Sequence, residues 1–478
     1  MLGRYRQPLP MSVLLIVSDA DGESLAASPL ARSLTDQRNA AWTFGPTDAE
    51  VLATVRVASD TLLRPGALEA LRAAFAEHPD IEAVLGDAIV GGARTLRPGW
   101  SPTTTAGAPA ELDLVATRGS GSGGTLADRI AVLGHLPVAT VGHLPVALVE
   151  RPAPETVDDA AQHAIADLVA ARRRLPQPTA ATFLIPTAGT RRVDGTRLVD
   201  HAIAAARGAG VDEIEILLVV GDEFDGDPAA LAADDVRIVR RDGPWSFSAA
   251  VNAGLLEAHH DHLVLVNDDV EMIDEGWAAP LLGHLRDPDV SLVGAALLYP
   301  DHRVQHIGIV IDDALPLHAH VGTRLGELRS PLRLPREVAA VTAACAAGRR
   351  RDLLAVGGLS EALPANFNDV DLCFKLQREI GRIVIDPTTP LVHHESASRV
   401  PVIEAWEWET FVGRWGEVVD PWYHPGHHRP DDPHDRRRNA DRLPPDEPDG
   451  RWALRTPTIR PTVHRARLEA PTADRPHG

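Results

Sequence analysis

The chain has 478 residues, of which 44% are hydrophobic and 24% charged, a composition that excludes a disordered or fibrous protein and allows two or three globular domains. Its formal net charge of -20 argues against a general nucleic-acid-binding protein, because neutralising phosphates requires a basic face. Cys345 and Cys373 are the only cysteines, which excludes a disulfide framework and a cysteine-based zinc site and favours a reducing compartment.

The N-terminal segment does not read as a targeting signal. The apolar run in MSVLLIVSD, which ends at Asp19, is too short for a signal peptide. No later apolar stretch approaches the roughly 18 residues that span a bilayer. We therefore expect a cytoplasmic protein.

An internal repeat divides the chain. Residues 60–84 align without a gap on residues 269–293, so that Asp60 falls on Asp269. Both segments contain an acid, a helical stretch, a Pro-Asp pair and an apolar strand, and we infer two copies of one fold. The predicted domains are residues 1–175 and 180–425.

The first copy differs from the second where chemistry is expected. Opposite Asn267 and Asp268 it has Ala58 and Ser59, so it lacks the acid pair. Its segment GSGSGG (119–124) lacks the GK[ST] ending of a phosphate loop, and we interpret it as a flexible surface linker. The hexapeptide GHLPVA, which begins at residue 134 and again at residue 142, is interpreted as two strand edges.

In the second copy, short apolar runs alternate with helical stretches, which predicts an α/β domain with a mostly parallel sheet. Expected strands are residues 181–185, 214–220, 236–240, 263–266 and 290–296, and expected helices include 196–207 and 249–258. In such a sheet, ligands bind outside the carboxyl ends of the strands.

The stretch HLVLVNDDVEMI (262–273) ends an apolar strand in two adjacent carboxylates, whose repulsion requires a counter-charge. Because side chains alternate along an extended chain, Asn267 and Asp269 are expected on one side and Asp268 on the other. A hard divalent cation, Mg2+ or Mn2+, would supply the counter-charge, with Asp269 as its ligand and Asp268 as a support or a sugar contact. An acidic turn that caps the following segment is the alternative.

Two later motifs carry similar side chains. FNDVDLCFKLQREIG (367–381) predicts a helix with Asn368, Asp369 and Asp371 at its start, where these residues also suit plain helix capping and the macrodipole. PLVHHESASR (390–399) ends an apolar run in His393 and His394, which are either metal ligands in a mixed shell or merely structural. Residues 426–478, rich in Pro, Asp and Arg, are expected to form a disordered polar tail.

Together, these three motifs resemble family 2 glycosyltransferases with the A-type fold, in particular the tandem-domain, rhamnosyltransferase-like members of O-antigen type. The resemblance covers about residues 181–425. It rests on motifs in family order: FLIPTAG (183–189), RDGPWSFSAAVNAG (241–254), LVLVNDDVE (263–271), LVGAALLYPDHRVQHIGIVI (292–311), VTAAC (341–345), FNDVDLC (367–373), HHESASR (393–399) and RWGEVVDPWYHP (414–425).

The resemblance implies two nucleotide-diphospho-sugar transferase domains, the first degenerate and non-catalytic. It further implies a nucleotide-sugar donor, a glycan or lipid-linked saccharide acceptor, a divalent cation, and inversion at the anomeric carbon. Asp369 would be the general base, and Asp269 and His393 the metal ligands, with His394 competing for that role. The other implied positions are Pro186, Thr187, Asp222, Asn252, Asn267 and Asp268 on the donor, and Asn368 and Asp371 in acceptor-side or supporting roles.

The chain departs from the family pattern at one position, and the sequence also allows other functions. Gly221 occupies the position of an acidic residue that usually contacts the nucleobase, with Asp222 next to it. A glycan-binding scaffold with decayed active sites is an alternative, as is a nucleotidyltransferase, for which a basic Gly-rich loop is missing. A lipid-linked acceptor would bring the protein to the inner face of the plasma membrane.

Overall fold

The computed structural model describes residues 13–19, 27–34, 37, 41–44, 50–95, 99–108, 112–191, 195–312, 315–328, 330–394, 403–416, 418, 420, 422–423 and 454–455. The expected disordered tail, apart from Leu454 and Arg455, lies outside the described residues, as do residues 395–402 after the paired histidines. Within the described ranges, no helix is both long and apolar enough to cross a bilayer.

The first unit, residues 13–172, is built on an 8-stranded sheet with strand order β2-β1-β3-β7-β5-β8-β4; the remaining strand, β6, pairs with β5. Its elements are β1 (Val13–Val17), α2 (Pro29–Leu34), β2 (Trp42–Phe44), β3 (Val51–Val57), β4 (Leu62–Leu63), α3 (Ala67–Glu77), β5 (Ala83–Val90), β6 (Ala93–Thr95), α4 (Pro102–Gly107), β7 (Leu114–Arg118), α5 (Leu126–Gly134), β8 (Val141–Arg151) and α6 (Asp159–Arg172).

The second unit, residues 180–416, is built on a 10-stranded sheet with order β11-β10-β9-β12-β19-β14-β20-β13; its remaining strands, β15 and β18, pair with β14 and β20. Its strands are β9 (Ala180–Thr187), β10 (Glu213–Val220), β11 (Val236–Arg240), β12 (His262–Val266), β13 (Val270–Met272), β14 (Val290–Leu298), β15 (Val304–His306), β16 (Ile309–Asp312), β17 (Leu315–His318), β18 (Arg336–Glu337), β19 (Cys345–Arg349) and β20 (Arg382–His393). Its helices are α7 (Leu198–Arg207), α8 (Phe247–Glu257), α9 (Ala278–His284), α10 (Arg350–Ala355), α11 (Asn368–Glu379) and α12 (Ala405–Trp415).

The two sheets share one topology, as the internal repeat predicts. In each, two parallel pairings (β2-β1-β3 and β10-β9-β12) lead to an antiparallel strand (β7 and β19). A parallel pair then follows, β5 with β8 and β14 with β20, and a short antiparallel edge strand closes each order. The α/β class with flanking helices is confirmed, and each sheet is mixed because β7 and β19 run against their neighbours.

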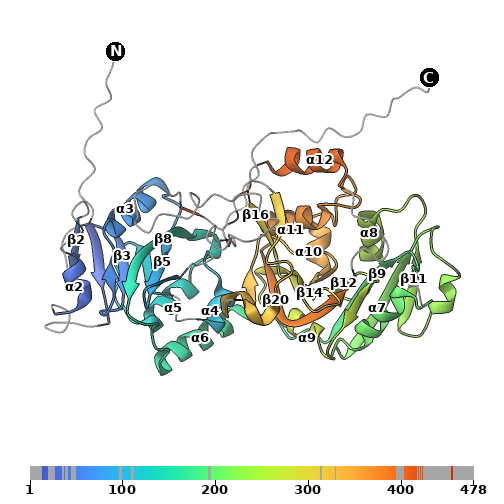
Figure 1. Cartoon of the computed structure of the whole chain (residues 1–478), viewed down its shortest axis with the longest axis horizontal. Helices are drawn as coiled ribbons and strands as arrows, with labels where there is room; N and C mark the ends of the chain where they lie inside the picture. The colour runs from blue at the N-terminus through green and yellow to red at the C-terminus, as the bar shows by residue number, and fades with distance from the viewer. Residues whose placement is uncertain are drawn as a thin grey trace, which may run out of the picture.

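Central strands are buried on both faces, which explains their continuous apolar sequences. All nine residues of β14, VSLVGAALL, are buried. On one face of the second sheet the core includes side chains of α8 and α11, and on the other it includes those of α7 and α9. Figure 1 shows the two units side by side along the long axis, with α12 lying over α11.

The Gly-rich segment 119–124 is an ordered loop between β7 and α5, which corrects its interpretation as a flexible linker. Gly124 is buried, and a Cβ there would come within 2.3 Å of the Ser18 backbone. The glycine is therefore required by close packing of two chain segments rather than by flexibility.

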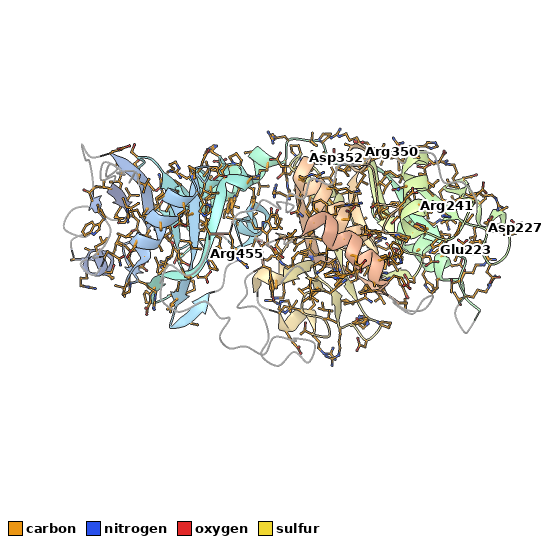
Figure 2. The ribbon with its side chains drawn as sticks, turned by 90° about the horizontal axis from the view of Figure 1, so that it is seen from above. Glu223, Asp227, Arg241, Arg350, Asp352 and Arg455 are labelled. Carbon is orange, nitrogen blue, oxygen red and sulfur yellow. The ribbon has the colours of Figure 1, made fainter. Side chains whose placement is uncertain are left out.

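The two units meet through α4 and the strand pair β18-β20. The carboxylate of Glu337, which is 1% exposed, accepts hydrogen bonds from Ser101 and Thr103 of the first unit and forms an ion pair with Arg382 of the second. Residues near the C-terminus also return to the first unit: Arg455 exchanges backbone hydrogen bonds with His143 at 2.8 and 2.9 Å. Figure 2 shows Arg455 beside the first sheet.

Candidate functional site

A cavity of about 800 Å³ opens at the carboxyl ends of β9 and β12 in the second unit. Most of the residues singled out from the sequence line it: Pro186, Thr187, Asn267, Asp268, Asp269, Asn368, Asp369 and His393. These come from β9, the turn after β12, the first turn of α11 and the end of β20, so segments far apart in the sequence converge on one space.

The chain turns at Asn267–Asp269 instead of remaining extended. The Val270 N–H donates to the Asn267 carbonyl at 3.2 Å, and the Asn267 N–H donates to Ala344 at 2.8 Å. All three polar side chains therefore line the same cavity, which corrects the expectation that Asp268 faces the opposite side.

Asp269 and His393 form a buried pair at the base of the cavity. Asp269 is 6% exposed, and its Oδ1 lies 3.0 Å from Nε2 of His393. The antiparallel pairing of β13 with β20 fixes them, because Val270 lies opposite His393. The distance permits an ion pair, yet Asp269 Oδ1 makes no hydrogen bond within the described residues.

Gln305 determines how the His393 ring faces Asp269. The Oε1 atom of Gln305 lies 2.7 Å from His393 Nδ1, while its amide Nε2 donates to the His393 carbonyl at 3.3 Å. This arrangement assigns a proton to His393 Nδ1, which donates to Gln305. Nε2 then faces the Asp269 carboxylate, and this contact is favourable only with a proton or a cation between the two atoms.

The pair fits a divalent cation. Two ligand atoms at adjacent corners of an octahedron of radius about 2.1 Å lie about 3.0 Å apart, and a carboxylate oxygen with an imidazole nitrogen is an accepted mixed donor set. No group of three or more His, Cys, Asp and Glu side chains in the described part of the chain is arranged to hold a metal ion. Asp269 and His393 would therefore leave most coordination positions to diphosphate oxygens and water.

Asp268 is held by the first strand of the sheet. Its Oδ2 accepts a hydrogen bond from Thr187 Oγ1 at 2.7 Å, and the Gly189 N–H donates to the same hydroxyl at 2.9 Å. Burial raises the pKa of Asp268 to about 6, the Thr187 hydrogen bond opposes this rise, and the charge of Asp269 adds to it. Asp268 and Thr187 thus form one polar patch on the cavity wall.

Asp369 faces the cavity from the first turn of α11. Its carboxylate accepts the N–H of Val370 at 2.8 Å and that of Ala343 at 3.4 Å. Burial raises its pKa above the ordinary range, and the nearby His318 counteracts this rise. A partly desolvated carboxylate of raised pKa in a cavity is suited to take a proton from a hydroxyl.

α12 holds the start of α11 in place. The backbone at Phe367 has φ of 60°, a strained value for a bulky residue, and its ring stacks on Phe411 of α12 with centroids 5.1 Å apart. The buried Glu407 accepts the N–H groups of Ala365 and Asn366. α12 thus fixes the segment that leads into Asp369.

Four of the residues assigned from the sequence lie away from the cavity. Asp371 is fully buried and accepts hydrogen bonds from Arg414 at 2.6 Å and Trp415 at 2.9 Å, so it anchors α12. Both amide atoms of Asn252 bond the backbone of Leu359 at 2.9 Å. His394 pairs with Glu271, whereas His393 lines the cavity.

The fourth residue, Asp222, is exposed and does not line the cavity; its neighbour Glu223 does. Sequence reasoning also missed Gln305 and His318, because each depends on a fold contact across more than ten residues. The only sequence signal was their place in VQHIGIVI and LPLHAH, histidine-containing stretches beside apolar strands. Figure 2 shows Glu223 on the second unit, in the same part of the ribbon as Arg241.

The first unit has a different pair at the equivalent place. Leu62 pairs with Glu150 as Glu271 pairs with Val392 in the second sheet. The repeat aligns Leu62 with Glu271, so their strand partners correspond as well. The residues that follow those partners, Arg151 in the first unit and His393 in the second, are therefore equivalent.

At that place in the first unit, the Arg151 Nη2 atom lies 3.0 Å from Asp60 Oδ1, the counterpart of Asp269. The guanidinium also reaches Glu155 at 2.8 Å and Asp113 at 3.4 Å. A side-chain cation therefore neutralises the first unit's acids where the second unit has an imidazole.

The second unit is thus an α/β domain whose cavity gathers carboxylate and imidazole side chains at the carboxyl ends of its strands. Residues 196–357 match the family model described as Glycosyl transferase family 2. The matched range contains the turn at Asn267–Asp269 and ends before Asp369 and His393.

Two curated relatives and one solved structure put the match in context. The chain is 40% identical over 169 residues to an uncharacterized protein, y4gI, of Sinorhizobium fredii, covering 34% of this chain and 18% of that protein. It is 32% identical over 244 residues to the O-antigen biosynthesis protein RfbC of Myxococcus xanthus, covering 48% and 19%. A crystal structure of GalNAc-T7 with UDP, GalNAc and Mn2+ shares 14% identity at a TM-score of 0.38, covering 50% of this chain and 48% of that one. The matches thus span less than a fifth of the length of both curated relatives.

Proposed function

We propose that the second unit transfers a sugar from a nucleotide-diphosphate-sugar donor to a hydroxyl of a glycan or lipid-linked saccharide. The observation that carries this proposal is a single cavity lined by the Asp269–His393 pair and by Asp369. One end offers a site for the donor diphosphate, and the other offers a base for the acceptor. The match of residues 196–357 to the Glycosyl transferase family 2 model supports the same reaction class.

The reaction we propose is one displacement. The acceptor oxygen forms a bond to the anomeric carbon while the bond from that carbon to the diphosphate oxygen breaks, and the bonding electron pair leaves with the nucleoside diphosphate. The hydroxyl proton passes to the Asp369 carboxylate. Because attack and departure occur on opposite faces of the sugar, the product has inverted anomeric configuration.

Asp269 and His393 would hold a divalent cation, Mn2+ or Mg2+. Such a cation offsets the negative charge that develops on the departing diphosphate, so the leaving group needs no proton. Gln305 keeps the His393 ring in the tautomer that leaves Nε2 free to bind, as outer partners of metal-binding histidines do. Pro186, Thr187, Asn267 and Asp268 line the donor end.

We infer the biological setting from the relatives. The relative RfbC is named for O-antigen biosynthesis, which supports a role in surface polysaccharide assembly. The resemblance to rhamnosyltransferase-like members makes deoxy sugars, rhamnose above all, the first donors to test. A lipid-linked acceptor would be met at the inner face of the plasma membrane.

We propose that the first unit is non-catalytic. Arg151 already supplies a positive charge beside Asp60, so a metal cation there would meet an unfavourable charge. The first unit would then serve as a packing partner of the second unit or as a glycan-binding surface.

Nucleoside diphosphate release tests the proposed function. Wild-type protein, Asp269→Ala and Asp369→Asn would be screened with nucleotide sugars in the presence of Mn2+ or Mg2+. We expect release to fall by a factor of about 100 or more in Asp369→Asn, the effect of losing a general base, and by a factor of about 100 in Asp269→Ala, which loses a ligand of the cation. Undiminished release in both variants would refute the site assignment. Glycan binding without release from any donor would instead favour the scaffold alternative.

A further inference from the structure

A pair of histidines stands next to Asp369. His318, the last residue of β17, is exposed and lines the cavity, and His306, in β15, is completely buried beneath it. Their Nδ1 atoms lie 3.2 Å apart and their rings meet edge to face at 69°. Neither histidine belongs to the cation pair or to the base described above.

The hydrogen bonds around His306 fix its tautomer. Burial lowers the pKa of His306 well below its usual value, so the ring is neutral and carries one proton. The Thr342 N–H donates to His306 Nε2 at 3.4 Å, so this nitrogen is an acceptor. The single ring proton therefore lies on His306 Nδ1, which donates it to His318 Nδ1.

The same contact determines what His318 offers to the cavity. Because its Nδ1 accepts the proton from His306, the proton of the neutral His318 ring lies on Nε2. His318 thus presents an N–H donor away from His306, from an exposed ring on the cavity wall.

His318 and Asp369 are tied to one short segment of backbone. The N–H of Thr342 holds His306, and the next N–H, that of Ala343, donates to Asp369 Oδ2 at 3.4 Å. His318 also lies close enough to Asp369 to oppose, electrostatically, the rise in the pKa of Asp369 that burial causes. Both residues line the same cavity, so a polar group of a substrate bound there could accept from His318 and donate to Asp369.

We propose that His318 positions the sugar acceptor, donating a hydrogen bond from Nε2 to an acceptor oxygen next to the hydroxyl that Asp369 deprotonates. The role rests on the proposed glycosyl transfer, and it adds a residue that recognises the acceptor. His306 acts through His318, as the group that holds its tautomer. The acceptor class implied is one with neighbouring hydroxyls, as on a saccharide ring.

The test separates transfer to an acceptor from donor hydrolysis by water. Wild type, His318→Ala and His318→Gln would be assayed with the active nucleotide sugar, with and without a panel of p-nitrophenyl glycosides as acceptor probes. Gln retains an N–H donor near the position of Nε2. His259→Ala serves as a matched control, because that histidine is exposed and does not line the cavity.

For His318→Ala we expect acceptor kcat/KM to fall about tenfold, mainly through KM, the effect of one lost hydrogen bond. Hydrolysis without acceptor should change less than twofold, and His318→Gln should recover most of the transfer. Equal transfer by His318→Ala and wild type would overturn the proposal, as would parallel loss of transfer and hydrolysis. A wild type that releases no nucleoside diphosphate from any donor would instead refute the proposed function, and this role with it.

A second measurement is independent of activity. Spectra of protein labelled with 15N-histidine, compared between wild type and His318→Gln, identify the His318 ring signals. We expect Nε2 to be protonated and Nδ1 to be an acceptor. A proton on Nδ1 of His318 would overturn the inference that this nitrogen accepts a hydrogen bond from His306.

Discussion

At the scale of single residues, the site depends on groups that hold its functional side chains in one state. Gln305 sets the tautomer of His393, Thr187 bonds Asp268, and His306 orients His318. The places of Asp269, Asp369 and His393 were foreseeable, because Asp269 and His393 follow apolar runs and Asp369 stands at the start of a predicted helix. Their partners were not, since each contact joins chain segments that only the fold brings together.

Gln305→Leu should weaken cation binding while leaving Asp269 and His393 intact. Without the amide acceptor, the His393 ring is free to adopt the other tautomer, and loss of such a partner typically weakens metal binding by a factor of about 10 to 100. Isothermal titration with Mn2+ measures the change, with Gln177→Leu, at an exposed glutamine outside the cavity, as control. Equal Mn2+ affinity in Gln305→Leu and wild type would remove Gln305 from this role.

Asp420 should make stability depend on pH. Burial raises its pKa to about 6, opposed by the backbone N–H groups of Ile311, Trp422 and Tyr423 that it accepts. Because the folded pKa exceeds the unfolded value of about 3.9, the stabilising contribution is full below pH 4 and is lost as pH rises through 6.

For Asp420→Asn, this pH-dependent loss, at most about 3 kcal/mol, should vanish. Urea unfolding at pH 4, 6 and 8 gives the free energies. As pH rises, the free energy of unfolding of the wild type should fall relative to that of the variant. A constant difference across these pH values would show that Asp420 titrates normally.

At the scale of elements, identical sequences adopt different structures. The first GHLPVA begins at the last residue of α5 and enters a 3-10 turn at Val138–Thr140, whereas the second lies inside β8. The expectation of two strand edges is thus correct only for the second copy. Tertiary pairing with β5 decides the outcome, because the local sequence is the same. The turn at Asn267–Asp269 was the alternative to an extended chain, and the sequence could not decide between them because its hydrogen bond to Ala344 is long-range.

Asp371 should stabilise the contact between α11 and α12 rather than take part in chemistry. It is fully buried and bonds Arg414, Trp415 and Lys375. Asp371→Ala would leave these donors without their acceptor and should lower the free energy of unfolding by about 3 kcal/mol. Urea unfolding measures it, with Glu379→Ala, an exposed acid on the same helix, as control. A cost no larger than that of the control would contradict the anchoring role.

At the scale of the whole molecule, the repeat was readable from residues 60–84 and 269–293, and the two sheets have matching strand orders. The way the units join was not readable, because Glu337 looks like any surface acid in the sequence. In the structure it is buried between Ser101, Thr103 and Arg382.

Glu337→Ala should uncouple the two units. Removing the carboxylate leaves the Arg382 guanidinium partly unpaired in the interface, a change that typically costs about 3–5 kcal/mol. Calorimetry should show wild type unfolding in one transition and the variant in two separated transitions. Glu327→Ala, outside this interface, is the control, and a single unshifted transition in Glu337→Ala would contradict the prediction.

In the proposed site, Asp269 and His393 bind the cation, and Asp369, in the same cavity, removes the proton without contributing to cation binding. Mn2+ affinity, measured by titration calorimetry on wild type, Asp269→Ala and Asp369→Asn, tests this division of roles most directly. We predict that Asp269→Ala loses Mn2+ binding by a factor of about 100 and that Asp369→Asn binds Mn2+ within a few-fold of wild type. Undiminished Mn2+ binding by Asp269→Ala would contradict the account.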